Sequence, residues 1–335
     1  MPELRIDPLS GLRVIIADER GERPGAWLRA AGRTPVEPQA DPFREGNEDQ
    51  TPPEVYALRP AGGAPDGPGW RVRVVPNRFP ALAPGAAPRP DPLGHGRGEP
   101  DLFAAGPASG AHEVIVNGPQ PVSSLLDLGP DGLAEAMAVW QQRMAAHPEA
   151  AYVHLIVNEG ESAGASLAHT HAQLYALPFV PAVVARERER FTAYHDRTQG
   201  RDLQADLLQE EVRRRERVVA VGPDAVALCP FASHVPFHVQ LMPRAPRPRF
   251  EDGGPTGAAT LHEVLERLAG AVGDIPPLNL WVRTAPPGST SFSWRIDLLP
   301  RLAHPAGLEM GAGVQLCVLA PERAAERLRG ASPPA

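Results

Sequence analysis

Cysteine is almost absent from this chain of 335 residues, which contains only Cys229 and Cys317. Two thiols are too few for a disulfide framework or a thiolate zinc site, so we expect both to be small buried hydrophobic residues. An excess of positive charge is lacking as well, because 33 Lys and Arg residues stand against 40 Asp and Glu residues and give a net charge of −7. This balance offers no overall attraction for a polyanion and argues against nucleic acid as a partner.

Long hydrophobic runs are also missing. No stretch approaches the roughly 20 apolar residues that span a bilayer, and the N-terminal MPELRIDPLSG lacks the apolar run of a signal peptide. We therefore expect no membrane partner and a cytoplasmic location. Hydrophobic residues nevertheless make up 42% of the chain, which is enough for a sizeable core in a globular protein.

Strand-like segments dominate the chain, with helical patterns between them. Runs rich in Val, Ile and Leu, with turn residues beside them, predict strands at 12–18, 70–76, 112–118, 152–158, 171–177, 225–231, 238–243, 278–284 and 293–300. Helical periodicity occurs at about 131–146, twice within 181–219, and at 258–273 and 321–329. Stretches rich in Pro and Gly predict loops at 59–69, 82–111 and 245–257.

The two halves of the chain resemble each other. The segment from His112 aligns without a gap with the segment from Phe237, at an offset of 125 residues. The same offset places residues 154–158 on 279–283, and an offset of one residue less places HTHAQL (169–174) on SWRIDL (293–298). A unit of strand, helix, strand and strand therefore occurs twice, which predicts one α+β body made of two related halves.

Only the first half has two histidines on its last strand. The second half has Ser293 and Arg295 where the first has His169 and His171, so the imidazoles are not needed to build the unit and indicate chemistry. On a strand, His169, His171 and Gln173 project to one face. Half a metal site and two structural histidines remain alternatives for this pattern.

The loop before this strand favours phosphate chemistry. Gly160, Gly164 and Ser166 lie in EGESAGAS (159–166), and such loops bind anions through backbone N–H groups. A neutral imidazole can attack phosphorus through one ring nitrogen while the other donates to a carbonyl. Gln173 could then hold a phosphoryl oxygen. The isolated histidines, by contrast, are expected to be core or surface residues: His112, His154, His234 and His238.

NEGESAGASLAHTHAQLYALP (158–178) resembles the active-site segment of galactose-1-phosphate uridylyltransferase and of related nucleotidyltransferases and phosphorylases of the histidine-triad superfamily. Residues 7–25, VVPNRFPAL (74–82), SWRIDLLPRL and GLEMGAGVQ resemble further family segments in the same order. The resemblance implies an α+β fold of two fused histidine-triad-like halves, mainly antiparallel sheets with flanking helices, often assembled as a homodimer. The implied divisions are a half carrying HxHxQ (1–180), a helical connector (181–219) and a half without the histidines (220–335).

The resemblance also implies roles for individual residues. It makes His171 the nucleophile that forms a nucleotidyl-histidine and Gln173 the side chain that stabilises this intermediate. It implies phosphate contacts from Arg20, Arg23, Asn158, Gly164 and Ser166, base and ribose contacts from Asn77 and Phe79, and hexose hydroxyl contacts from Glu309 and Gln315.

The chain departs from the family at its metal sites. Many members have a zinc CxxC pair where this chain has Asp41 and Arg44, and a further zinc histidine where it has Pro121. A second metal site uses an HWH motif, which reads SWR at 293–295 here. One remaining imidazole cannot hold a tetrahedral zinc ion, so we expect no metal and no other cofactor. His169 should instead orient its strand through hydrogen bonds.

The sequence thus predicts an enzyme that moves a nucleoside monophosphate between a nucleotide sugar and a sugar 1-phosphate through a covalent nucleotidyl-histidine. A nucleotide-sugar phosphorylase or hydrolase would use the same histidine. An inactive nucleotide-binding or scaffold relative is the alternative of another class. The base and the sugar remain open at this point.

Overall fold

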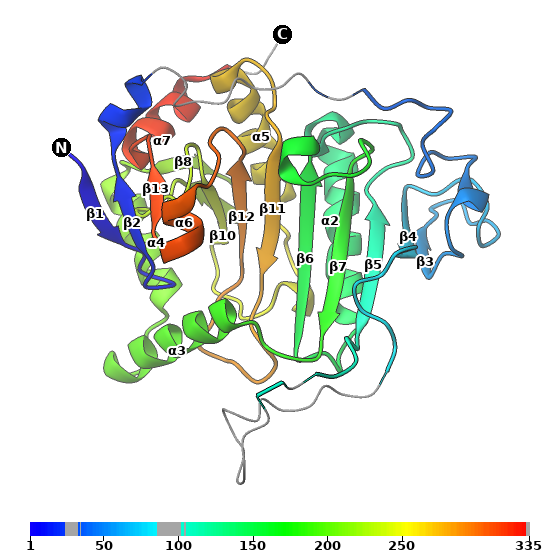
Figure 1. Cartoon of the computed structure of the whole chain (residues 1–335), viewed down its shortest axis with the longest axis horizontal. Coiled ribbons are helices and arrows are strands. Elements are labelled where there is room, and N and C mark those ends of the chain that lie inside the picture. The colour runs from blue at the N-terminus through cyan, green and yellow to red at the C-terminus, as the bar shows by residue number, and fades with distance from the viewer. Residues whose placement is uncertain (24–32, 34, 86–101, 104, 333–335) are drawn as a thin grey trace.

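The computed structural model describes residues 1–23, 33, 35–85, 102–103 and 105–332. Its centre is a ten-stranded antiparallel sheet in the order β3 (Tyr56–Leu58), β4 (Val72–Pro76), β5 (Ala111–Val116), β7 (His171–Leu177), β6 (Tyr152–Glu159), β11 (Leu278–Arg283), β12 (Arg295–Pro300), β10 (Val239–Pro243), β9 (Ala225–Leu228) and β8 (Val218–Val221). A three-stranded sheet of β1 (Glu3–Ile6), β2 (Arg13–Ile16) and β13 (Gln315–Cys317) lies at the end of the molecule that the second half occupies (Figure 1).

Helices cover the large sheet on one face. The helices α2 (Gly129–Ala145) and α5 (Ala258–Val272) bury their apolar sides against it, and alternate residues of the strands complete this core, among them Leu155, Leu174 and Leu280. Because strand side chains alternate between faces, the intervening residues point to the other face. The last helix, α7 (Pro321–Gly330), packs on α5 and β8. Among the described helices, none is long and apolar enough to cross a membrane.

The opposite face is covered differently in the two halves. In the second half, α3 (Ala182–Arg197) and α4 (Leu203–Arg214) pack there, with Phe191 and Leu208 against Met242 of β10. In the first half, Phe43 and Trp70, from the segment before β4, form a smaller apolar cluster. Both cysteines are free and buried, as expected.

The pairing of the two central strands shows the duplication. β6 and β11 are antiparallel neighbours, and Leu155 lies opposite Val282. The offset of 125 residues carries this pair onto Leu280 and Val157, which are also opposite each other in the same ladder. The pairing therefore repeats when the halves are exchanged, as an approximate two-fold axis between β6 and β11 requires. The expected fold of two fused, related halves is confirmed.

The alignment expected for the first strand of the unit is wrong by one residue. Val114 lies opposite Gln173 in the first half, and Gln240 lies opposite Asp297 in the second. Since Gln173 corresponds to Asp297, Val114 corresponds to Gln240, one residue later than the sequence comparison placed it. Alternating strands fit either register when no distinctive residue marks the match, which explains the error.

The expected elements are all present, although several begin or end a few residues away. Sequence patterns missed β1, β3, β8 and β13, which have three or four residues each and are too short to show a period. The six-residue helix α6 (Gly307–Ala312) was missed for the same reason. The predicted loop at 82–111 lies partly outside the described residues.

Candidate functional site

The HxHxQ strand β7 presents its polar side chains to the face opposite α2. Ala172 and the residues at alternate positions after it are buried in the core beneath that helix, so His171 and Gln173 project to the other face. Asn158 follows Val157, which pairs with Ala172, and it therefore lies beside His171. Three of the expected site residues thus share one surface.

The ring of His171 is held through one nitrogen. Its Nδ1 lies 2.8 Å from the backbone carbonyl of His169, and because a carbonyl only accepts, Nδ1 carries the proton. In the neutral ring the lone pair is then on Nε2. Burial lowers the pKa of His171 and favours the neutral form, with Phe43 packed at a ring distance of 5.1 Å. This is the state in which an imidazole is a nucleophile.

His169, two residues before the start of β7, is held by hydrogen bonds at both ring nitrogens. Its Nδ1 lies 2.6 Å from Oδ2 of Asp41, and its Nε2 lies 2.9 Å from the carbonyl of Gly118. The backbone carbonyl only accepts, so Nε2 carries a proton, and the short contact of Nδ1 with the Asp41 side chain fixes the other edge of the ring. Oδ1 of Asp41 also accepts from the backbone N–H of Phe43, which places this aromatic ring beside both histidines.

The residues at the positions where the resemblance implies metals do not fit a metal ion. Both nitrogens of His169 are engaged, Asp41 is its acceptor, and Pro121 offers no ligand atom. At the second position Arg295 places a cation where a metal would bind. Within the described part of the chain, no group of three or more His, Cys, Asp and Glu side chains could hold a metal.

Gln173 is embedded in a network that the sequence did not reveal. Its Oε1 accepts from the hydroxyl of Tyr175 at 3.0 Å and lies 3.0 Å from Nε2 of His112. The backbone N–H of Ala81 donates to Nδ1 of His112, so Nε2 carries the proton of the neutral ring. Burial lowers the pKa of His112, in agreement with neutrality. The Asn77 amide nitrogen is 3.1 Å from the same Nε2, a contact that is no hydrogen bond while Nε2 is protonated.

The same pair of positions is in contact in the second half. By the corrected register His112 corresponds to His238, and Gln173 corresponds to Asp297. Nε2 of His238 lies 3.3 Å from Oδ1 of Asp297. The contact therefore belongs to the duplicated unit. An alignment in the correct register would have shown two histidines in equivalent places, which is the signal that could have found His112.

The loop 159–168 and its anchor form the next part of the site. Asn279 of β11 donates from Nδ2 to Oδ1 of Asn158 and to the carbonyl of Ala163, both at 2.8 Å. Gly160 and Gly164 flank the short helix η4 (Glu161–Ala163) with φ of 82° and 89°, values that favour glycine. A residue of the second half thus holds the loop of the first, a relationship that no local pattern predicts.

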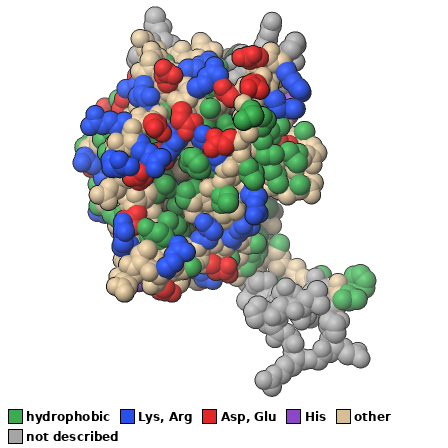
Figure 2. Space-filling model, turned by 90° about the vertical axis from the view of Figure 1, so that its left-hand side faces the viewer, with side chains coloured by type: hydrophobic (Ala, Val, Ile, Leu, Met, Phe, Trp, Pro, Cys, Tyr) green, Lys and Arg blue, Asp and Glu red, His purple; other side chains and the backbone are tan. Residues whose placement is uncertain are grey.

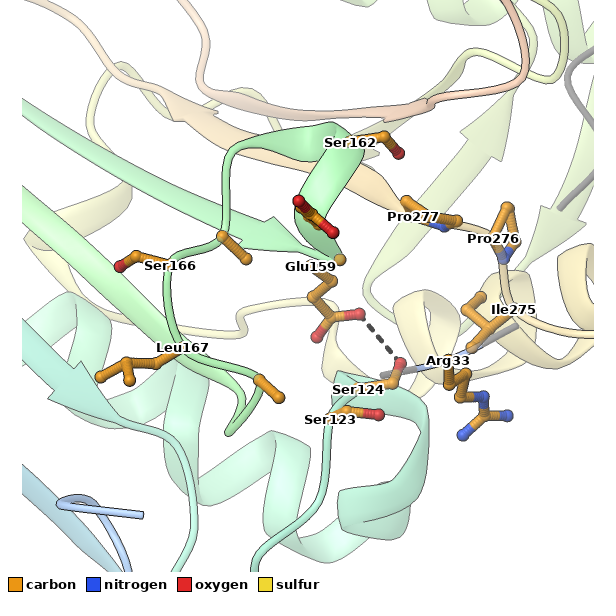
Figure 3. Close-up of a pocket in the computed structure, with 14 residues that line it drawn as sticks. Arg33, Ser123, Ser124, Glu159, Ser162, Ser166, Leu167, Ile275, Pro276 and Pro277 are labelled. Carbon is orange, nitrogen blue, oxygen red and sulfur yellow. Dashed lines mark hydrogen bonds between the residues drawn. The ribbon is translucent and has the colours of Figure 1, made fainter. Parts of the chain in front are cut away.

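A cavity of about 820 Å³ borders this loop (Figure 3). Polar groups around it include Arg33, Glu159 and four serines: Ser123, Ser124, Ser162 and Ser166. The Glu159 carboxylate accepts from the hydroxyls of Ser124 and Thr170 at 2.9 Å and from the N–H of Leu125 at 2.6 Å. Burial nevertheless raises its pKa to about 7.

The remaining expected residues fall into two groups. Asn77 lies by His112, and its Oδ1 accepts from the backbone N–H of Phe79, a residue that is 83% exposed. Four residues lie elsewhere. They are the two arginines expected to contact phosphate, Arg20 and Arg23, and the two residues expected to contact the hexose, Glu309 and Gln315. They belong to η1 (Asp18–Glu22) and the residue after it, to α6 and to β13, around the small sheet at the other end of the molecule (Figure 1).

In the second half, an ion-pair cluster occupies the position equivalent to His171. Arg295 stands at the position of His171, and its guanidinium binds the Glu187 carboxylate of α3 at 3.0 and 3.1 Å. Asp297 approaches the same guanidinium at 3.1 Å. These side chains are almost completely buried, so an ion-pair cluster under α3 fills the equivalent place.

A profile of the galactose-1-phosphate uridyl transferase N-terminal domain matches residues 1–181. The chain belongs to the galactose-1-phosphate uridyl transferase family. It is 27% identical over 345 residues to ADP-glucose phosphorylase of Arabidopsis thaliana, covering 99% of this chain and 93% of that protein. It is 28% identical over 347 residues to galactose-1-phosphate uridylyltransferase of Rattus norvegicus, covering 97% and 86%.

Solved structures agree with this assignment. The Arabidopsis thaliana ADP-glucose phosphorylase with bound ADP-glucose superposes with a TM-score of 0.78 at 26% identity and covers 99% of both chains. A uridylyltransferase superposes with a TM-score of 0.71 at 25% identity and covers 98% of this chain and 97% of its own. The expectation of an enzyme of the hexose-1-phosphate uridylyltransferase type is confirmed, in a family whose named members include uridylyltransferases and a nucleotide-sugar phosphorylase.

Proposed function

We propose that this uridyl transferase family member moves a nucleoside monophosphate from a nucleotide sugar to a sugar 1-phosphate in two steps. In the first, the lone pair on Nε2 of His171 forms a bond to the α-phosphorus of the donor. The bond from that phosphorus to the bridging oxygen breaks, and its electron pair leaves on the sugar 1-phosphate. In the second, an oxygen of the acceptor's phosphate attacks the same phosphorus and the N–P bond returns its electrons to Nε2.

The observation that carries this proposal is the hydrogen bond between Nδ1 of His171 and the carbonyl of His169, at 2.8 Å. It supports attack by Nε2 because the proton is held on the other nitrogen. It also supports the covalent intermediate, in which the ring becomes positively charged and Nδ1–H donates more strongly. Burial, which lowers the pKa of His171, keeps the ring unprotonated at neutral pH.

Hydrogen-bond donors around the loop can stabilise the negative charge that develops on the phosphoryl oxygens. We assign this role to the amides of Gln173 and Asn158 and to the hydroxyl of Ser166, which lines the neighbouring cavity. Fixed donors that point at developing charge supply the larger part of catalysis in phosphoryl chemistry. We place the phosphate chain of the donor along this loop, with the base toward Asn77 and Phe79.

The positions of Arg20 and Glu309 support a homodimer. Both lie around the small sheet, apart from β7 (Figure 1). If they contact the substrate, as the family resemblance implies, they must reach His171 from a second copy of the chain. Figure 2 views the molecule from that end and shows basic, acidic and hydrophobic side chains intermixed there. Exposed apolar residues of β1 and α6 include Ile6 at 51% and Met310 at 76% exposure. We propose that this end contacts the partner's site.

Mixing two inactive variants tests the shared site. His171→Asn removes the nucleophile and Arg20→Ala removes a charge that would act in the other subunit. After the two proteins are unfolded and refolded together, the proposal expects activity to return, because one site in each mixed dimer has both residues. Failure to recover activity, with mixed dimers verified by mass, would place Arg20 in the same subunit as His171.

Phosphorolysis is the second candidate, favoured by the full-length likeness to ADP-glucose phosphorylase. It shares the first step and replaces the acceptor by inorganic phosphate. Product analysis separates the candidates: UDP-glucose or ADP-glucose is supplied with galactose 1-phosphate, with phosphate, or with water alone. Transfer predicts a new nucleotide sugar only with the first acceptor. No turnover with any acceptor, together with unchanged nucleotide affinity in His171→Asn, would identify the chain as a binding protein.

The proposal includes no metal or other cofactor. At both family metal positions the side chains already have partners: Asp41 contacts His169, and Glu187 forms an ion pair with Arg295. Elemental analysis of the purified protein should find zinc and other transition metals well below one equivalent, with activity retained after dialysis against a chelator. Stoichiometric metal that disappears together with activity would contradict this part of the proposal.

A further inference from the structure

Two half-buried side-chain amides, those of Asn158 and Gln173, lie on the same face of the sheet as His171. An amide presents either its oxygen or its nitrogen, and which end points outward follows from the partners of the other end. The distinction matters because a phosphoryl oxygen can only accept. An amide whose oxygen faced it would repel the substrate.

The partners of Asn279 fix the orientation of Asn158. One hydrogen bond of Asn279 goes to the backbone carbonyl of Ala163, which only accepts, so the atom of Asn279 at that contact is its nitrogen. The same nitrogen lies 2.8 Å from the Asn158 side chain, so the Asn158 atom there is the oxygen. The NH2 group of Asn158 therefore points away from Asn279, toward the side of the loop where Gly164 lies.

The partners of Gln173 fix its amide in the same way. The N–H of Ala81 makes Nδ1 of His112 an acceptor and leaves the proton on Nε2, which then donates to Gln173. The Gln173 atom at that contact is consequently its oxygen, and the hydroxyl of Tyr175 donates to the same atom. The rings of His112 and Tyr175 stack at 4.1 Å, which keeps both donors in place.

We propose that His112, Tyr175 and Asn279 are positioning residues that hold the Gln173 and Asn158 amides with their NH2 groups toward the substrate. The site then offers only donors to the phosphoryl oxygens before the substrate arrives, and no reorganisation is needed during the reaction. This inference rests on the proposed nucleotidyl transfer. It also gives the second half of the chain, through Asn279, a part in a site that belongs to the first.

Asn279 provides the sharper test, because one substitution removes its hydrogen-bond donor and another replaces the donor by an acceptor. Asn279→Ala frees the Asn158 amide to rotate. Asn279→Asp offers only acceptors, so Asn158 should turn its NH2 group inward and its oxygen toward the substrate. Loss of one hydrogen bond to a charged group corresponds to about tenfold. We expect the single-turnover rate of His171 nucleotidylation to fall about tenfold in Asn279→Ala and further in Asn279→Asp.

A double-mutant comparison separates positioning from a structural role. If Asn279 acts through Asn158, its substitution should change the rate less than twofold in an Asn158→Ala background. Trp281→Phe, on the same strand and face, is the matched control and should change the rate less than twofold. An equal effect of Asn279→Ala with and without Asn158 would overturn the inference. Melting temperatures identify any variant that fails to fold.

The Gln173 pair is tested by His112→Phe and Tyr175→Phe, which keep the stacked rings. Each single variant leaves one donor on the Gln173 oxygen and should slow nucleotidylation by a few-fold. The double variant leaves none and should slow it by about tenfold or more, with no further loss in a Gln173→Ala background. If the double variant lost the same factor in rate with and without the Gln173 amide, the inference that His112 and Tyr175 position Gln173 would be overturned.

Nucleotide binding keeps this inference distinguishable from the proposed function. Calorimetric titration with UDP and ADP needs no turnover. If the wild type formed no nucleotidyl-histidine, the proposed function would fail. The positioning inference would still stand if Asn279→Asp weakened UDP or ADP binding only when Asn158 is present. It would fall if the loss of affinity were the same in both backgrounds.

Discussion

Arg295 occupies in the second half of the sheet the position that His171 occupies in the first. Arg295 lies two positions before Asp297, and His171 lies two positions before Gln173. Asp297 pairs with Trp281 of β11, and Gln173 pairs with the equivalent residue of β6, Ile156. One half thus has a buried imidazole at this position, whereas the other has a guanidinium bound to Glu187. The two equivalent positions therefore differ: one is a candidate reactive site, and the other is a buried ion pair of Arg295 and Glu187, here called the brace.

The brace makes a prediction about stability. Arg295→Met leaves the buried Glu187 carboxylate without its main partner, and such a loss costs about 3–5 kcal/mol. Replacing both residues, Arg295→Met with Glu187→Met, should recover part of the loss because the Glu187 carboxylate is gone, while Asp297 keeps its hydrogen bonds from Gln240 and Trp281. Urea unfolding measures both effects. Labelling of His171 in the folded variants should persist. A single variant as stable as the double would contradict the brace.

The pair between Asp41 and His169 should matter for both stability and rate. Asp41→Ala leaves the buried His169 ring without its side-chain partner, and we expect a loss of about 1–3 kcal/mol in the free energy of unfolding. Asp41→Asn keeps one acceptor and should lose less. Because the His169 carbonyl holds the His171 ring, nucleotidylation should slow in the same order. If Asp41→Ala unfolded like the wild type, the pair would have no stabilising role.

Glu159 predicts a pH dependence of stability. Burial raises its pKa from 4.5 to about 7, so the folded protein binds a proton more tightly than the unfolded chain between these values. The free energy of unfolding should therefore fall as pH rises through this window, by up to about 3 kcal/mol, and level off above it. Glu159→Gln lacks the ionisable group. The stability difference between wild type and Glu159→Gln, measured from pH 4 to 8, should show this fall, and a constant difference would contradict it.

The rate of nucleotidylation should report the ionisation of His171. Protonation of Nε2 removes the nucleophile, so the single-turnover rate should be flat at neutral pH and fall in acid. An ordinary histidine would reach half its maximum near pH 6.5. Since burial lowers the pKa of His171, we predict a midpoint below that value. A midpoint at or above it would show that the ring is stabilised in its charged form.

The parts of the site that follow from local pattern could be predicted from sequence. The strand 171–177 was predicted with its observed bounds, and alternation alone placed His171 and Gln173 on one face. The glycines of the preceding loop indicated its conformation. In each case the residues that determine the geometry lie within a few positions of each other, so period and turn chemistry suffice.

Contacts between distant segments could not be predicted. His169 meets Asp41 across 128 residues, and Asn158 meets Asn279 across 121. Both depend on which segments become neighbours, and for the second pair on the junction of β6 with β11, which no local pattern specifies. The role of His112 was hidden for another reason: a register error of one residue aligned it with Phe237 and concealed its counterpart His238.

The central claim is that Nε2 of His171 bonds covalently to phosphorus. Its most direct measurement is intact-protein mass spectrometry after incubation with UDP-glucose or ADP-glucose without acceptor, followed by peptide mapping under basic conditions that preserve phosphoramidates. The account predicts a gain of one nucleoside monophosphate on the peptide that contains His171, removed by acid or by added acceptor, and no gain in His171→Asn. An adduct that persists in His171→Asn, or turnover by the wild type with no adduct under any condition, would contradict it.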